Sequence, residues 1–144
     1  MRIALVAPSC PLKAEAADAV RRIVAGRGDA DLVIHSQCFA SEGHFAGSDE
    51  VRLAALHEVM ADPAVDAVWF ARGGYGSNRI VEAAARDLPA AARAKTYLGY
   101  SDGGFLLASL QKQVSKWCIF VKTALPEVGA TNQHNLGSCR FLLR

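Results

Sequence analysis

Short apolar runs alternate along the chain with segments whose apolar residues recur at helical spacing. Ile3 to Ala7 is continuously apolar, as expected for a strand buried on both faces of a sheet, and Pro8 to Pro11 breaks this run. Ala14 to Ala25 carries apolar residues three and four positions apart and is followed by glycines, the pattern of a helix with its C-cap. Further strands are expected over residues 31–35, 65–71 and 95–100, and further helices over residues 80–86 and 105–110.

The middle of the chain predicts a loop followed by a capped helix. Residues 37–47 are polar, contain glycine and show no period, so we expect an exposed loop. Ser48 can cap the next helix with its hydroxyl, and Asp62 with Pro63 ends that helix. The expected buried stripe of this helix comprises Val51, Ala55, Leu56, Val59 and Met60.

This alternation is typical of parallel strands joined by crossover helices. The predicted fold is therefore a Rossmann-like α/β domain with a mainly parallel sheet of four or five strands and flanking helices. Residues 114–122 are rich in β-forming side chains and could supply the fifth strand. Open sheets of this class bind ligands at the carboxyl ends of their strands, so we expect the site after the third and fourth strands.

Composition narrows the function classes. The 144 residues are 51% hydrophobic and 21% charged, which is typical of one soluble domain with a core. No apolar run approaches the roughly 20 residues that cross a membrane, so no membrane partner is expected. The net charge of +2 comes from interspersed signs, so nucleic acid is not an expected partner. The first apolar run is too short for a secretory signal, and we expect a cytoplasmic protein.

The four cysteines, at positions 10, 38, 118 and 139, form no C-x-x-C pair and no zinc-finger spacing with histidine. Nothing in the pattern indicates an oxidising compartment, so we expect reduced thiols without a metal. No metal or organic cofactor is implied.

A glycine-rich loop follows the third predicted strand. Gly73, Gly74 and Gly76 remove the Cβ atoms that would block a ligand and free backbone amides to face an anion or a developing oxyanion. The alternative is a tight turn that needs only positive φ angles. The spacing is not that of a dinucleotide-binding loop, because Arg79 stands where the third glycine belongs, and no P-loop lysine follows.

A second motif follows the fourth predicted strand. Residues 99, 101 and 103 match G-x-S-x-G between a strand and a helix, the context of a nucleophile elbow that lifts a serine Oγ above the sheet edge. Amides at the start of the next helix could stabilise an oxyanion beside Ser101. In the alternative interpretation, Ser101 is only a helix N-cap and Asp102 a favourable first-turn anion.

Four blocks of sequence occur in an order and spacing that resemble a known family. They are Phe45 to Leu53, Asp62 to Trp69, Arg72-Gly73-Gly74-Tyr75-Gly76 and Gly99-Tyr100-Ser101-Asp102, and Ile3 to Ser9 fits as well. Together they resemble the amino-terminal domain of the L,D-carboxypeptidase family, which includes murein tetrapeptide carboxypeptidases and microcin C self-immunity proteins. The similarity covers about residues 1–112.

The resemblance implies a cytoplasmic serine peptidase that cleaves the amide bond to a terminal D-amino acid in small muropeptides, during cell-wall recycling. It implies that Ser101 is the nucleophile and that the Asp102 amide, with an amide of Gly73 or Gly74, forms the oxyanion hole. A contact of Arg72 or Tyr75 with the substrate carboxylate is a weaker implication, since each side chain could equally serve an ion pair or packing.

The remaining members of the Ser-Glu-His triad come from a second, carboxy-terminal domain in this family. Residues after Gln113 do not resemble it, so we expect a nucleophile-bearing domain over 1–113 and a divergent, truncated or frame-shifted tail over 114–144. Glu127 and His134 follow Ser101 in the triad order, but the tail has the composition of a loop, and we expect them on the surface. The other histidines, His35, His44 and His57, match no catalytic position of the family.

Three functions therefore stay open. The first is an L,D-carboxypeptidase-like hydrolase domain whose activity is impaired without Glu and His. The second is an α/β-hydrolase esterase, disfavoured because too little chain follows Ser101 for that fold. The third is a non-catalytic fragment whose amides bind a peptide carboxylate. The number of subunits is not fixed, and a homodimer stays open.

Overall fold

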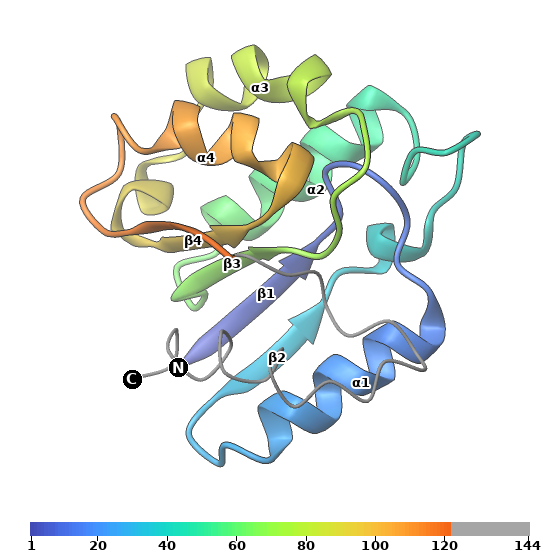
Figure 1. Cartoon of the computed structure of the whole chain (residues 1–144). Helices are drawn as coiled ribbons and strands as arrows, with labels where there is room; N and C mark the ends of the chain where they lie inside the picture. The colour runs from blue at the N-terminus through green and yellow to red at the C-terminus, as the bar shows by residue number, and fades with distance from the viewer. Residues whose placement is uncertain (122–144) are drawn as a thin grey trace.

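A computed structural model describes residues 1–121 of the chain as a five-stranded sheet with flanking helices (Figure 1). The strands are β1 (Arg2–Val6), β2 (Asp31–Ile34), β3 (Ala67–Phe70), β4 (Thr96–Gly99) and β5 (Cys118–Phe120). Their order in the sheet is β2-β1-β3-β4-β5, and every neighbouring pair is parallel. This confirms the predicted Rossmann-like class, including the fifth strand.

Four α-helices and three short 3-10 turns connect the strands. The helices are α1 (Ala14–Ala25), α2 (Asp49–Ala61), α3 (Ser77–Arg86) and α4 (Gly104–Leu110), and the turns are η1 (Ser36–Phe39), η2 (Ala90–Ala94) and η3 (Ser101–Gly103). The observed α1 has the predicted bounds, whereas α3 begins three residues before the predicted Ile80. The predicted domain boundary at residue 113 stays a prediction; β5 lies beyond it.

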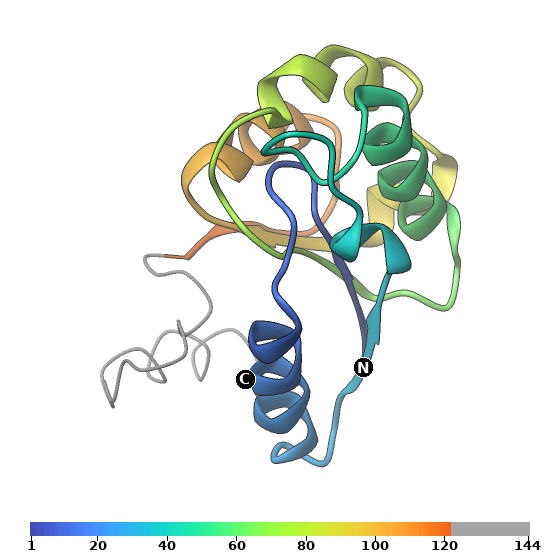
Figure 2. The same ribbon diagram turned by 90° about the vertical axis from the view of Figure 1, so that its right-hand side faces the viewer.

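The sheet separates two apolar cores. On one face α1 packs through Ala17, Val20 and Val24 against the side chains of Ile3 and Leu5. On the other face α2, α3 and α4 cover the alternate side chains of the same strands, and the turned view shows α1 alone on its side (Figure 2). Because both faces are covered, β1 and β3 are almost entirely buried, as their continuous apolar runs predict.

The cap of α2 is as predicted, but its buried stripe is not. The Ser48 hydroxyl accepts a hydrogen bond from the Val51 backbone N–H at 3.3 Å. The prediction that Val51 is buried is wrong, because its side chain is 45% exposed, and Arg52 is fully buried in its place. The reason is that three loop carbonyls meet at the start of α2 and accept hydrogen bonds from the Arg52 guanidinium group.

The prediction of an exposed loop over residues 37–47 is partly wrong. The segment opens with η1, and Gln37 is 5% exposed. Its side-chain amide donates to the carbonyls of Ala7 at 2.8 Å and Ala46 at 2.6 Å, and its carbonyl accepts from the Ala7 N–H at 3.1 Å. A buried polar side chain that satisfies three backbone groups holds this loop against the end of β1.

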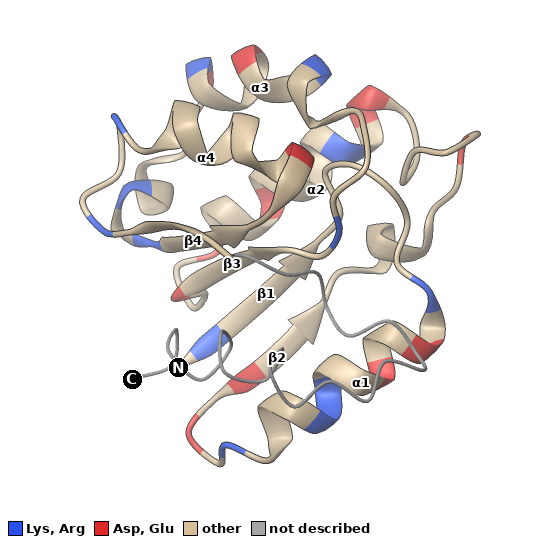
Figure 3. Ribbon diagram, viewed as in Figure 1, with Lys and Arg blue, Asp and Glu red and all other residues tan. Residues whose placement is uncertain are grey.

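Within the described residues, no helix has both the length and the apolar character needed to span a membrane. Residues with charges of both signs are interspersed over this part of the chain (Figure 3). Glu127, His134 and Cys139, discussed above from the sequence, lie outside the described residues.

Candidate active site

Ser101 lies at the carboxyl end of β4, in a strained backbone conformation. Its φ angle is 51°, and among residues 1–121 no other non-glycine residue has a positive φ. Such a left-handed conformation costs an L-residue free energy and is concentrated at functional sites, including nucleophile elbows. The side chain is exposed at the turn from β4 into η3 and α4.

The alternative interpretation of Ser101 as a helix N-cap is wrong. The N-cap residue of η3 is Tyr100 and that of α4 is Gly103, and no side chain caps either element. Within the described residues the Ser101 hydroxyl makes no hydrogen bond with any other group. The hydroxyl is therefore available to a ligand.

The glycine-rich loop after β3 runs directly against Ser101. A Cβ atom at Gly73 would lie 2.7 Å from the Ser101 Cβ and 3.0 Å from its Oγ, so no side chain fits there. Gly74 and Gly76 have φ angles of 117° and 112°, which glycine adopts readily. Glycine is therefore required at Gly73 by the close approach of Ser101, and it is favoured at Gly74 and Gly76 by the backbone conformation. The predicted role of the loop amides in binding an anion or oxyanion stays a prediction.

Several backbone amides of these two loops, including three that the sequence analysis singled out, have no acceptor in the described part of the chain. The N–H groups of Gly73, Gly74 and Asp102 donate no hydrogen bond to any group within residues 1–121. Amide groups without an internal partner bind water or a ligand. The structure thus brings Ser101 beside Gly73, and the N–H groups of Gly73, Gly74 and Asp102 are among the donors of the two adjoining loops that have no acceptor within residues 1–121.

The Asp102 side chain is buried beneath the elbow. It is 8% exposed, and its Oδ2 accepts from the Ser9 hydroxyl at 2.6 Å and from the Ser77 N–H at 2.8 Å. The Ser77 hydroxyl in turn donates to the Asp102 carbonyl oxygen at 2.5 Å. Sequence reasoning missed Ser9 and Ser77; the only signal was that each follows a glycine- or proline-containing break after a buried strand.

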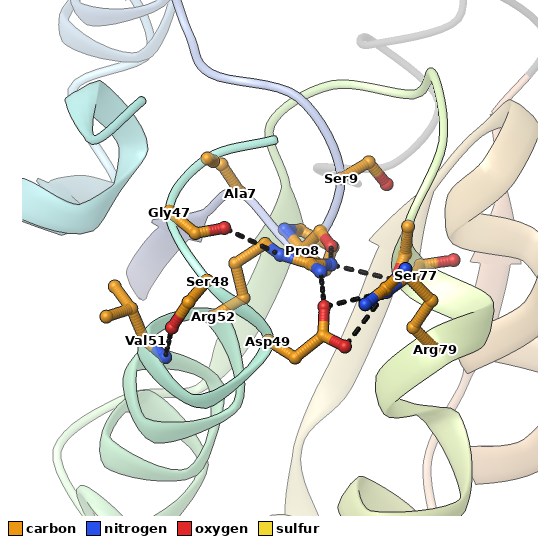
Figure 4. Close-up of polar contacts among 12 residues, drawn as sticks. Ala7, Pro8, Ser9, Gly47, Ser48, Asp49, Val51, Arg52, Ser77 and Arg79 are labelled. Atoms are coloured by element: carbon orange, nitrogen blue, oxygen red, sulfur yellow. Dashed lines mark hydrogen bonds and ion pairs between the residues drawn. The ribbon is translucent and has the colours of Figure 1, made fainter. Parts of the chain in front are cut away.

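Arg52, at the start of α2, joins three loops through hydrogen bonds to their carbonyls (Figure 4). Its Nη1 donates to the carbonyls of Pro8 at 2.6 Å and Gly76 at 2.8 Å, and its Nε donates to the carbonyl of Gly47 at 3.2 Å. Its Nη2 bonds to the carboxylate of Asp49. Burial lowers the pKa of the Arg52 guanidinium, and the negative charge of Asp49 opposes that shift.

Asp49 also links this buried cation to the surface. Arg79, on α3, donates from Nε to both oxygens of Asp49 at 2.9 and 2.8 Å. The ring of Phe45 lies against both guanidinium groups, 5.1 Å from that of Arg52 and 5.5 Å from that of Arg79. Phe45 and Asp49 belong to the first sequence block of the family resemblance, and this packing explains why those residue types occur there.

Arg72 and Tyr75 are exposed on the same loop as Gly73. The Arg72 Nη1 donates to the carbonyl of Pro11 at 3.2 Å, and Tyr75 is 74% exposed. Neither observation tests whether Arg72 or Tyr75 binds a substrate carboxylate, so that role stays a prediction.

Histidine contributes no base to Ser101 within residues 1–121. His35 accepts at Nδ1 from the Gln37 N–H, and its Nε2 lies 3.2 Å from a Glu58 carboxylate oxygen. His57 has a buried Nε2 without a hydrogen-bond partner on α2. In the same residues, no group of three or more His, Cys, Asp or Glu side chains could hold a metal ion.

Known proteins are similar to this chain in sequence. A murein tetrapeptide carboxypeptidase of Pseudomonas aeruginosa is 30% identical over 111 residues, which are 77% of this chain and 36% of that protein. A Streptomyces coelicolor protein named as a carboxypeptidase is 38% identical over 104 residues, which are 70% of this chain and 33% of that protein. The chain thus spans about a third of the length of these curated relatives.

Solved structures show the same fold. The muramoyltetrapeptide carboxypeptidase of Oxalobacter formigenes superimposes with a TM-score of 0.63 at 25% identity, over 79% of this chain and 38% of that one. A microcin C7 self-immunity protein superimposes with a TM-score of 0.64 at 22% identity, over 86% of this chain and 37% of that one. The family model described as the LD-carboxypeptidase N-terminal domain matches residues 3–120, and the chain therefore belongs to the LD-carboxypeptidase family.

Proposed function

We propose that this chain is the nucleophile-bearing part of a serine-type L,D-carboxypeptidase that acts on small muropeptides in the cytoplasm. The observation that carries the proposal is the strained Ser101, whose hydroxyl has no hydrogen-bond partner within residues 1–121 and whose side chain faces Gly73, near the unpaired amides of Gly73, Gly74 and Asp102. Family membership supports the reaction class, and the names of the relatives support a cell-wall peptide as substrate.

In the proposed reaction, the Ser101 Oγ attacks the carbonyl carbon of the amide bond to the terminal D-amino acid. The carbonyl oxygen becomes an oxyanion, which accepts hydrogen bonds from the N–H of Asp102 and from that of Gly73 or Gly74. The C–N bond then breaks, the amine leaves with a proton, and water hydrolyses the acyl-serine. In this proposal Arg72 and Tyr75, which are both exposed on the loop after β3, contact the substrate carboxylate.

The proton of Ser101 must pass to a base, which family resemblance assigns to a Glu-His pair in a second domain. No group in residues 1–121 bonds to the Ser101 hydroxyl. This observation favours one second candidate, a domain whose amides bind a peptide carboxylate without cleaving it. An elbow with an oxyanion hole retains a residual acceleration of roughly 10³–10⁴ over water without its triad partners, so the two candidates are separable.

A fluorophosphonate probe distinguishes them, because a nucleophilic serine Oγ displaces its fluoride and becomes bonded to phosphorus, whereas a domain that only binds a carboxylate forms no such bond. We expect mass spectrometry to find the adduct on Ser101 and not on other exposed serines of the same chain, and Ser101→Ala to abolish it. Absence of a Ser101 adduct in the folded chain overturns the hydrolase proposal. In that case, saturable binding of a cell-wall tetrapeptide, measured by calorimetry, would identify the binding domain instead.

A further inference from the structure

The carboxylate of Asp102 connects the ends of three strands. It lies on the segment that follows β4, and it accepts at a single oxygen, Oδ2, from Ser9 after β1 and from the first residue of α3, Ser77, after β3. The donors lie 93 and 25 residues away in sequence. At 8% exposure, these bonds are shielded from competition by water.

The polar groups of Asp102 fall into two sets. Its side-chain Oδ2 and its backbone carbonyl are both bonded to Ser77, so this side of the residue is fixed on the start of α3. Its backbone N–H has no acceptor within residues 1–121, and the preceding residue is the strained Ser101. The bonded oxygens thus tie Asp102 to the loop after β1 and to the start of α3, and its backbone N–H is left without an acceptor in the described residues.

A strained φ persists only where the surrounding contacts determine it. Ser101 has no hydrogen bond of its own from its hydroxyl, so the contacts that hold its conformation must come from its neighbours. Gly73 limits the Ser101 side chain from one side. On the other side, the Gly104 N–H donates to the Ser101 carbonyl and the Gly103 N–H donates to the Tyr100 carbonyl, and Asp102 adds the side-chain hydrogen bonds to Ser9 and Ser77.

We infer that the Asp102 carboxylate is a positioning residue: its bonds to Ser9 and Ser77 hold the Ser101–Asp102 peptide so that the Ser101 hydroxyl and the Asp102 N–H face the same carbonyl. This inference rests on the proposed function. It adds a role for the Asp102 side chain, whereas the proposed reaction uses only the backbone N–H of that residue. The positioning depends on an oxygen acceptor at the Oδ2 position, and the negative charge is not required.

The two donors share one oxygen, so Asp102→Asn can keep both bonds through its amide oxygen, whereas Asp102→Ala loses both. The test has two readouts for each variant: the rate at which the fluorophosphonate probe modifies Ser101 in solution, and the φ angle of Ser101 in a crystal structure. A displacement of about 1 Å at a reacting group costs on the order of 100-fold in rate, so Asp102→Ala should be slower by 10-fold or more at a rough estimate. Asp102→Asn should restore the rate to within about 3-fold, the loss reflecting its weaker, uncharged acceptor.

Tyr97→Phe is the matched control, because it removes one buried hydrogen bond, to the Ala92 carbonyl at 2.9 Å, outside the site. It should leave the Ser101 rate unchanged. If Asp102→Ala does not fold, Ser9→Ala removes one of the two bonds without changing Asp102, and it should slow Ser101 as well.

The inference is overturned if folded Asp102→Ala reacts at the wild-type rate with Ser101 still at positive φ, or if Asp102→Asn is as slow as Asp102→Ala. A wild-type chain that takes no probe refutes the proposed function instead. The crystals then decide the inference separately: Ser101 should leave the left-handed region in Asp102→Ala and stay there in Asp102→Asn.

Discussion

The contact between Gly73 and Ser101 offers a direct perturbation of the site. In Gly73→Ala, the new methyl group would lie 2.7 Å from the Ser101 Cβ, 3.0 Å from its Oγ and 3.3 Å from a ring carbon of Tyr100. The φ of Gly73 lies outside the positive range, so the backbone itself accepts alanine. The substitution therefore acts on the Ser101 side chain and little else.

The size of the effect follows from these distances. Carbon atoms in contact prefer roughly 3.5–4.0 Å, so the β3–α3 loop and the elbow must separate by about 1 Å. A shift of that size at a reacting group corresponds to a loss on the order of 100-fold in rate. Because Ser101 is exposed and can move outward, the stability cost should stay near the lower end of overpacking, about 1 kcal/mol.

The assay is the rate of fluorophosphonate modification at Ser101, with thermal unfolding measured in parallel. Gly26→Ala is the control, because it makes the same chemical change at the end of α1, where the nearest atoms lie 3.4 and 3.6 Å from the added carbon. It should leave the Ser101 rate unchanged. A folded Gly73→Ala variant with a wild-type Ser101 rate would refute the reasoning that this loop faces the reacting group.

Three further predictions concern the framework of the site. Arg52→Gln leaves loop carbonyls without their buried donor and should lower the free energy of unfolding by about 3 kcal/mol or more in urea titrations. Arg79→Gln, at the exposed end of the same network, should lower it by less than about 1 kcal/mol. Equal losses in the two variants would contradict the argument that the buried position of Arg52 makes its bonds more stabilising. Burial raises the pKa of the Cys38 thiol to about 12. Iodoacetamide at pH 8 should therefore label half-buried Cys10 and spare Cys38 in the folded chain. Labelling of both cysteines at the same rate would be inconsistent with the burial of Cys38. Burial also raises the pKa of the Cys118 thiol to about 11, so the thiols of Cys38 and Cys118 stay protonated in the folded state above pH 9, whereas in the unfolded chain they lose their protons. The free energy of unfolding should therefore fall as pH rises from 9 towards 11. A pH-independent free energy of unfolding over that range would contradict this prediction.

Local patterns in the sequence predict the elements of this fold well. The bounds of α1, the Ser48 cap of α2 and the burial of β1 all follow from periodicity, capping chemistry and apolar runs. The G-x-S-x-G spacing and the glycine cluster point to the two loops that the structure brings together. These features are local, so a single stretch of sequence contains the information.

The features that were missed depend on contacts between distant segments. Arg52 is buried because carbonyls of Pro8, Gly47 and Gly76 meet around it, and no periodicity rule for α2 contains those positions. Gln37 is likewise buried because backbone groups of Ala7 and Ala46, from distant parts of the chain, meet around its side-chain amide. The roles of Ser9 and Ser77 likewise require the end of β1 and the start of α3 to meet at Asp102.

The central claim is that Ser101 and the unpaired amides of the two loops surround one carbonyl. A crystal structure of the Ser101 phosphonate adduct tests it most directly. The account predicts a phosphonyl oxygen roughly 2.7–3.1 Å from the Asp102 nitrogen and from the nitrogen of Gly73 or Gly74. An adduct whose phosphonyl oxygens all point into solvent, away from both loops, would contradict it.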